Sequence, residues 1–214
     1  MTRIIHVEAS PRRTTSRSSE AATAFLSKIA EAAPNAEIDH LGLWDVSLPD
    51  LDGDALAAKY ARLSKTPLTA DQQAAWDGIT KLVGRLDAAD AVLISTPMWN
   101  LHLPYRLKHW IDLVTQPGLS FSFDPQSGYA PLLRPRPTIV ILASAGDFSS
   151  GRSFGRTDFA SDYLRAALGF IGLTGAEIVP VQPTAGAPDL VSAGVAAAQD
   201  RLAELASSFA GAVR

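Results

Sequence analysis

The sequence contains no cysteine, and this absence removes a whole set of chemistries at once. Without thiols the chain can form no disulfide, hold no iron–sulfur cluster or thiolate-bound zinc, and use no cysteine nucleophile. Histidine is scarce as well: there are four, and none lies after His109. No two of them have the spacing of metal ligands, so the sequence predicts no metal site.

Charged side chains and long apolar runs are also in short supply. Asp, Glu, Lys and Arg make up 19% of the 214 residues and leave a formal net charge of −3, so no broad basic field is available for nucleic acid or an anionic membrane. No apolar run is long enough to span a bilayer, and the one at residues 4–7 is too short for a signal peptide. We therefore expect a soluble, cytoplasmic protein without membrane or nucleic-acid partners. Its low charge favours a buried subunit interface.

Short apolar runs alternate with helical patterns along the whole chain. The apolar runs predict five strands, at residues 4–7, 36–43, 92–95, 138–143 and 176–181. The helical patterns lie at residues 18–33, 54–63, 70–86, 103–115, 154–170 and 189–213, and residues 120–123 and 129–132 could form a hairpin arm. Thr69 is a suitable N-cap for the third helix, because its hydroxyl can accept an unpaired backbone N–H. With 47% apolar residues the chain can form one full core, so we expect a single domain over residues 1–214.

The strand and helix pattern also predicts a topology. Continuous apolar strands separated by helices imply a parallel sheet covered on both faces. Right-handed crossovers then give a three-layer α/β sandwich with strand order 2-1-3-4-5, the flavodoxin-like arrangement. In that order the loops after the first, third and fourth strands meet at one crevice. We expect the ligand there, between residues 8–18, 96–103 and 144–155.

The first of these loops is rich in groups that bind anions. Residues 9–19 contain three arginines and six serines or threonines just before a predicted helix, whose N-terminal amides would add to the site. Neither GxxxxGK[ST] nor GxGxxG is present, so neither a nucleoside triphosphate nor a Rossmann dinucleotide is indicated. The loop is interpreted as a phosphate site. A helix cap within a solvated basic loop is the alternative, above all for Arg12 and Arg13.

The loop after the third strand is built from large side chains in place of the usual Gly, Ser and Asp. Residues 97–104 read Pro-Met-Trp-Asn-Leu-His-Leu-Pro. Apolar groups and an amide at the carboxyl edge of a parallel sheet favour a flat apolar ligand. His102 could contact the substrate or simply lie on the surface. Four apolar residues of the following helix share one face and predict core or subunit interface: Leu107, Trp110, Ile111 and Val114.

A rival motif occurs at residues 151–155, which form the pattern Gly-x-Ser-x-Gly of a hydrolase nucleophile elbow. An elbow needs a strand directly before the serine and a histidine later in the chain. The predicted fourth strand ends at residue 143, and no histidine follows the pattern. The motif therefore does not indicate a hydrolase.

The motifs of the first and third loops, and of the helix that follows, resemble those of the FMN-dependent NADH-azoreductases, which are homodimeric, flavodoxin-like NADH:quinone oxidoreductases. The resemblance rests on Ala9-Ser10, Ser16-Arg17-Ser18, Pro97-Met98-Trp99-Asn100, Leu103-Pro104 and Leu107-Lys108-His109-Trp110-Ile111-Asp112. Residues 118–123 and 169–173 are similar to the family segments Gly-Val-Thr-Phe and Gly-Phe-Ile-Gly-Ile. The resemblance thus extends over essentially the whole chain.

This resemblance implies an FMN site assembled from all three loops. It places the FMN phosphate at Ser10, Ser16, Arg17 and Ser18. It places the ribityl chain and the ring at Pro97, Met98, Trp99, Asn100 and Leu101, with Asn100 as the amide donor to the ring edge. The other rim of the ring would be covered by Ser144, Ala145 and Gly146. The substrate pocket would take residues from both subunits, namely His102, Phe123, Phe148 and Phe170.

Two departures from the family pattern stand out. Trp99-Asn100-Leu101 replaces Tyr-Asn-Phe, an apolar exchange that should keep flavin binding but change the fit of the substrate. After the fourth strand the family has Ser-Arg-Gly-Gly, whereas this chain has Ser144-Ala145-Gly146-Asp147 and so lacks the arginine and one glycine.

The resemblance implies chemistry that the cofactor itself carries. Hydride transfer to a flavin needs no protein acid, base or nucleophile, which agrees with a third-strand loop free of carboxylates. NADH, or NADPH, and then a quinone or azo compound would bind in turn at the same face, which predicts ping-pong kinetics. Two alternatives stay open: a flavodoxin-type electron carrier without enzymatic activity, and a flavin-free interaction module.

Overall fold

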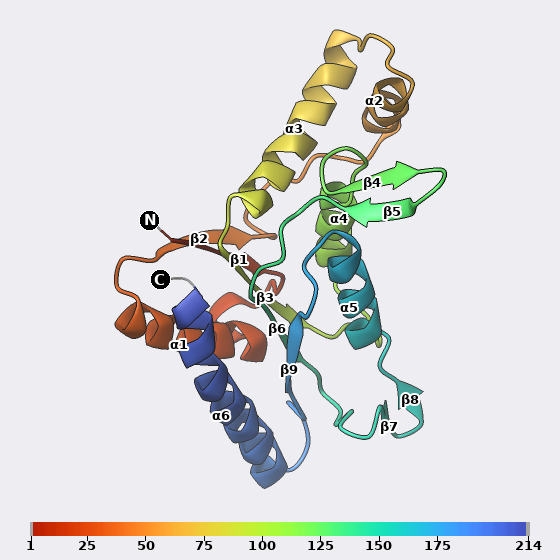
Figure 1. Cartoon of the computed structure of the whole chain (residues 1–214). Helices are drawn as coiled ribbons and strands as arrows, with labels where there is room; N and C mark the ends of the chain where they lie inside the picture. Colours follow the sequence, from red (N-terminus) through yellow and green to blue (C-terminus); the bar gives the residue numbers. More distant parts are fainter. Residues whose placement is uncertain (1, 213–214) are drawn as a thin grey trace.

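Five parallel strands form the centre of the structure, a computed structural model that describes residues 2–212 (Figure 1). They are β1 (Arg3–Glu8), β2 (Glu37–Gly42), β3 (Ala91–Pro97), β6 (Thr138–Ala143) and β9 (Glu177–Val181). Each pairs in parallel with its neighbour, in the order β2-β1-β3-β6-β9. Numbered within this sheet alone, that is the predicted order 2-1-3-4-5. The α/β fold class and the topology are confirmed.

Helices cover both faces of the sheet (Figure 1). On one face lie α1 (Arg17–Ala32) and α6 (Pro188–Ala212), which pack on residues such as Ile4 and Leu93. On the other lie α3 (Ala70–Asp87), α4 (Tyr105–Val114) and α5 (Ala160–Phe170). The neighbouring strand positions, such as Ile5 and Val92, point to this second face, because successive side chains of a strand alternate. The central strands are therefore apolar at nearly every position.

Two smaller units project from the sandwich. The helix α2 (Gly53–Leu63) packs against α3, and the strands β4 (Phe121–Asp124) and β5 (Gly128–Pro131) form an antiparallel hairpin (Figure 1). The predicted hairpin arm is thus confirmed. The predicted cap of α3 is confirmed as well: Gln72 N donates to Thr69 Oγ1 at 3.3 Å, and Thr69 N donates to Gln72 Oε1 at 3.0 Å. Such a reciprocal pair satisfies two helix-terminal amides.

The prediction of a helix over residues 154–170 is wrong for the first third of this range. Residues 152–157 instead form a second hairpin, from β7 (Arg152–Ser153) and β8 (Arg156–Thr157). Phe154 and Gly155 turn the chain with φ values of 49° and 79°, which no α-helix contains. The helix α5 begins only at Ala160, after Asp158 Oδ1 has accepted Ala160 N at 2.8 Å.

Smaller differences concern element ends. The strand β3 continues to Pro97, because Thr96 and Pro97 still align with residues 142–143 of β6. The helix α4 begins at Tyr105, with Pro104 as its N-cap, rather than at residue 103. A short 3-10 turn, η1 (Arg13–Thr15), precedes α1. Val213, the predicted last residue of the final helix, lies outside the described residues.

The apolar face of α4 belongs to the core. The four side chains that share this face are at most 3% exposed, and they are Leu107, Trp110, Ile111 and Val114. The prediction of core or interface is thus resolved in favour of core. Within residues 2–212 no helix is both long and apolar enough to cross a membrane.

Candidate functional site

A cavity of about 430 Å³ lies between the loops that follow β3 and β6. This is the carboxyl edge of the parallel sheet, where open α/β folds bind their ligands. The cavity is lined by Met98, Asn100, Leu101, Ser144, Ala145, Gly146, Phe148 and Arg156. All of these except Arg156 were predicted as site residues from the sequence, so the structure brings the two loops together as expected.

The loop after β3 turns back on itself in four residues. Trp99 N donates to His102 O at 2.8 Å, and His102 N donates to Trp99 O at 2.9 Å. Between them Asn100 and Leu101 have φ values of 48° and 69°. A turn with two positive φ values is a type I′ turn, which favours Asn and Gly at its centre. Leu101 is therefore strained, and strain of this kind gathers at ligand sites.

The loop after β6 is held by the end of β9. Ser144 N donates to Val181 O at 3.1 Å, and Ser144 Oγ donates to Gly146 O at 2.8 Å. The side chain of Gln182 accepts Phe148 N through Oε1 at 3.1 Å. Gln182 was missed from the sequence, since only the fold brings it beside a loop 34 positions away.

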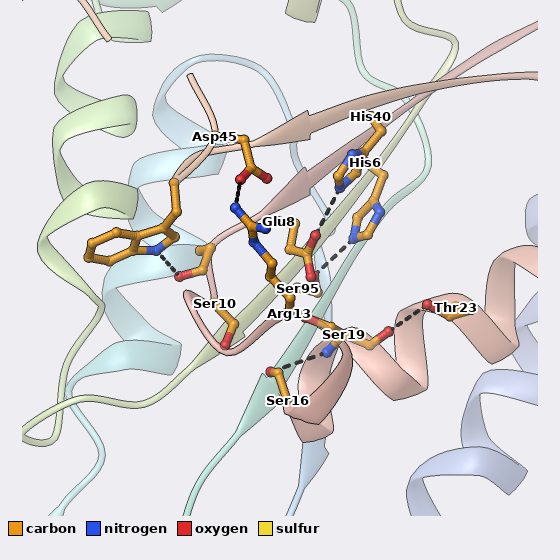
Figure 2. A network of polar contacts seen from close by, with 12 residues as sticks. His6, Glu8, Ser10, Arg13, Ser16, Ser19, Thr23, His40, Asp45 and Ser95 are labelled. Carbon is orange, nitrogen blue, oxygen red and sulfur yellow. Dashed lines mark hydrogen bonds and ion pairs between the residues drawn. The ribbon is translucent and has the colours of Figure 1, made fainter. Parts of the chain in front are cut away.

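The start of α1 forms the second half of the candidate site. Ser16 caps the helix, because its Oγ accepts Ser19 N, and it lies 3.1 Å from the Ser18 hydroxyl oxygen. Figure 2 shows Ser16 at the start of the helix and Ser10 in the loop before it. The side chains of Ser10, Ser16 and Ser18 belong to residues at most 4% exposed. Hydroxyls and unpaired amides at a helix N-terminus are suited to an anion.

Two of the three arginines of the first loop are paired with carboxylates. Arg17 Nη1 pairs with Glu20 Oε2 at 3.0 Å on the surface. Arg13 pairs with Asp45 (Figure 2), and Arg12 is exposed. For Arg17 the structure therefore offers the backbone N–H at the first position of α1, whereas its guanidinium is turned to Glu20.

Trp44, which was not predicted, links the two halves of the site. Its Nε1 donates to Ala9 O at 2.9 Å, and its ring lies 5.9 Å from that of Trp99 and 5.3 Å from that of Tyr105. Ala9 N in turn donates to Ser95 O at 2.8 Å. Trp44 follows β2, whose loop was not expected at the crevice, so the sequence carried no signal for it.

Several predicted residues lie near the cavity without lining it. Pro97 ends β3, and Trp99 is turned toward Trp44 and Tyr105. The ring of His102 packs 4.9 Å from that of Tyr163 on α5. The residues of the first loop, namely Ser10, Ser16, Arg17 and Ser18, also lie outside the cavity lining.

Phe123 and Phe170 belong to a separate aromatic cluster on the β4–β5 hairpin and α5. The ring of Phe170 lies 4.8 Å from that of Phe121 and 5.5 Å from that of Tyr129. Phe123 lies 4.8 Å from Tyr129 and is 58% exposed. This cluster does not contribute to the 430 Å³ cavity of its own chain.

A polar network lies on the strands beside the first loop (Figure 2). His6 Nε2 is 2.9 Å from Ser95 Oγ, and His40 Nε2 is 2.9 Å from Glu8 Oε2. Burial lowers the pKa of His6 to about 4, with a further lowering by His40 that Glu8 opposes. His6 is therefore neutral at pH 7. Both histidines lie on strands, as predicted.

The chain is similar to known proteins over nearly its whole length. A family model described as "Flavodoxin-like fold" matches residues 2–206. The FMN-dependent NADH:quinone oxidoreductase 1 of Bradyrhizobium diazoefficiens is 44% identical over 209 residues, which cover 98% of this chain and 100% of that protein. The chain belongs to the FMN-dependent NADH:quinone oxidoreductase family. The family resemblance inferred from the sequence motifs is thus confirmed.

Further relatives agree with this assignment. The FMN-dependent NADH:quinone oxidoreductase 3 of Pseudomonas fluorescens is 39% identical over 98% of both chains. A crystal structure of an azoreductase from Bacillus anthracis matches with a TM-score of 0.88 and 26% identity, over 98% of this chain and 100% of that one. An FMN-dependent NADH-azoreductase from the same organism, solved in complex with FMN, matches with a TM-score of 0.86 and 25% identity over the same shares.

The buried His6 predicts a pH-dependent stability. Between pH 6.5 and 4 the unfolded chain binds a proton at this residue that the folded chain does not, so the free energy of unfolding should fall as the pH falls through this range. The full loss is about 3 kcal/mol. Urea unfolding at pH 7.0 and 4.5 measures it.

His6→Gln should remove most of this pH dependence, whereas His40→Gln, at an exposed position, should retain most of it, because burial is the largest cause of the lowered pKa of His6. An NMR titration that gave the His6 imidazole an ordinary pKa would contradict the explanation.

Proposed function

We propose that the protein uses FMN to pass two electrons from NADH to quinones, and that it also reduces azo compounds. One observation carries the proposal: a buried, serine-lined helix N-terminus and a cavity lined by the β3 and β6 loops lie at the same edge of the sheet. This is an anion site beside a site for a flat ring. The relatives named above support the cofactor, the electron donor and the substrate class.

The start of α1 fits the phosphate of FMN. Among the described residues, Ser19 Oγ is buried without a hydrogen-bond partner, and the backbone N–H of Ser19 donates to the capping hydroxyl of Ser16. Buried hydroxyls normally have partners, so an unpaired one suggests a ligand atom. We assign the phosphate to the hydroxyls of Ser10, Ser16 and Ser18 and to the helix-terminal amides, with Arg17 contributing its backbone N–H.

The cavity fits the ribityl chain and the ring. Met98, Leu101 and Phe148 provide apolar surface and would exclude water from the ring faces. Asn100, which is held in its left-handed conformation by the turn, presents an amide that can donate to the ring edge. Ser144, Ala145 and Gly146 would cover the opposite rim. Pro97 and Trp99 would shape the loop rather than touch the ring.

When bound, FMN would accept a hydride from NADH and donate it to the substrate, so the protein has to position partners and exclude water. No carboxylate lines the cavity among the described residues, which agrees with chemistry that needs no protein base. Because one cavity would serve donor and acceptor in turn, we propose a ping-pong order. NADPH is the alternative donor.

We further propose that two copies form a homodimer. The aromatic cluster on the hairpin and α5 exposes large apolar side chains, with Phe123 58% and Tyr129 63% exposed. Exposed apolar groups of this size, gathered on one projecting arm, are typical of an interface. Placed against a second copy, Phe123 and Phe170 would complete the partner's substrate pocket, next to its His102 and Phe148. We place this dimer, with one FMN-binding domain over residues 1–214 of each copy, in the cytoplasm.

The function predicts a yellow protein with FMN bound and steady NADH oxidation in the presence of a quinone. Initial rates measured over a grid of NADH and quinone concentrations should give parallel double-reciprocal lines, as ping-pong kinetics require. The same preparation should decolourise an azo dye.

An electron carrier of the same fold would bind FMN without sustaining turnover. A colourless protein that ignores added FMN would end the proposal altogether.

The phosphate site predicts a charge effect at Ser16. Ser16→Asp keeps a good N-cap and should leave the fold intact, but its carboxylate would repel the FMN phosphate and weaken FMN binding about a hundredfold or more. Ser16→Asn has a similar shape and capping ability without the charge, and should lose far less. Fluorescence titration of FMN with each apoprotein measures the difference, and equal affinities for the two variants would rule out a phosphate at this helix end.

The dimer predicts that a charge in the aromatic cluster separates the subunits. Phe123→Asp should raise the dimer dissociation constant at least about tenfold, because the carboxylate would be buried in an apolar contact. Gln126→Asp, in the turn of the same hairpin, should have little effect. Sedimentation velocity over a concentration series gives the constants, and a wild-type protein that sediments as a monomer throughout would refute the dimer.

A further inference from the structure

One charged side chain lines the candidate flavin cavity and has no role in the function proposed so far. Arg156 is the only ionisable residue in the lining of this cavity. Its Nε donates to Ser153 O at 3.1 Å. Within residues 2–212 no carboxylate lies within ion-pair distance of its guanidinium. Arg13 and Arg17, in the first loop, differ from it in that each is paired with a carboxylate.

The β7–β8 hairpin holds this guanidinium at the cavity. The hairpin reverses at Phe154 and Gly155, and its inner residue Ser153 is only 3% exposed. Ser153 packs on Gly146 so closely that a Cβ at Gly146 would collide with Ser153 Oγ. The same Cβ would lie 3.4 Å from Arg156 Nη2. The guanidinium thus lies directly beside the β6 loop, at the position where Gly146 leaves room for it.

The other lining residues restrict which part of a ligand can contact the Arg156 guanidinium. The surface provided by Met98, Leu101 and Phe148 is apolar and suits the faces of a flat ring. A guanidinium in such a cavity is best satisfied by a ligand edge that carries acceptor atoms, with which it can form charge-assisted hydrogen bonds. Of the flavin edges that carry acceptor atoms, the N1 and C2 carbonyl side of the pyrimidine ring is the one that gains negative charge when the ring is reduced.

We propose that Arg156 faces the pyrimidine edge of the bound flavin and stabilises its reduced form, so that it sets the reduction potential of the cofactor. The inference rests on the proposed function, because it needs FMN in the cavity. A fixed positive charge stabilises the state in which negative charge develops more than the state in which it does not. Arg156 would therefore bind reduced FMN more tightly than oxidised FMN, and would act on the cofactor directly.

The experiment compares two arginines of one hairpin. Both arginines are exposed, but only Arg156 lines the cavity. Arg156→Gln therefore removes the charge at the cavity, and Arg152→Gln removes the same charge from β7, outside the lining. For each FMN-loaded variant, the potential of the bound flavin is measured by equilibration with a reference dye. The affinity for oxidised FMN is measured by fluorescence.

We expect Arg156→Gln to lower the preference for reduced over oxidised FMN about tenfold, which is about 30 mV for two electrons. Arg152→Gln should leave the potential at the wild-type value. Arg156→Lys, which keeps the charge but not the planar fork, should lie between wild type and Arg156→Gln.

Three results would overturn the inference. The first is an unchanged potential in Arg156→Gln. The second is an equal shift of the potential in Arg152→Gln, which would show that any positive charge on the hairpin has this effect. The third is an effect on binding without an effect on the potential. An equal loss of affinity for oxidised and reduced FMN would make Arg156 an anchor for FMN, and a raised KM for NADH would make it an anchor for the donor. In all three cases wild-type protein still binds FMN and turns over, so failure of this inference is distinct from failure of the proposed function.

Discussion

The parallel pairing of β1, β3 and β6 is the constraint on which the rest of the structure depends. Backbone hydrogen bonds align Val7 with Ile94, and Ile94 with Val140, so the three strands end at one edge. The loops that follow must therefore emerge side by side, whatever their sequences. The candidate cavity and the serine-lined start of α1 both lie at this edge.

Polar contacts of residues that do not line the cavity then hold the loops in position. Trp44 connects the first loop to Trp99 in the loop after β3, and Gln182 holds the loop after β6 through Phe148 N. His6 lies 2.9 Å from Ser95 Oγ through its Nε2, and burial keeps its imidazole neutral at pH 7. None of these residues is placed to touch a flavin. Each of them holds the loops that form the site and takes no part in its chemistry.

The two halves of the site handle charge in different ways. At the start of α1 the groups available to the phosphate are neutral hydroxyls and amides, since Arg13 and Arg17 are paired with carboxylates. In the ring cavity the charge comes from Arg156, on a hairpin far along the chain from both loops. The anion would thus be held by dipoles, and the electron-accepting ring would be tuned by a full charge.

Local pattern was enough for the strand order, the ends of most elements, the cap at Thr69 and the meeting of the loops after β3 and β6, because apolar periodicity and parallel topology act on every chain in the same way. The seven cavity residues within those loops were predicted from the family resemblance. It failed at residues 152–157, where a two-residue turn with positive φ values interrupts a helical pattern. Only the tertiary structure could bring Trp44, Gln182 and Arg156 to the site, or turn Trp99 and His102 away from it. Those placements arise from contacts between segments distant in sequence, and such contacts leave no periodicity to detect.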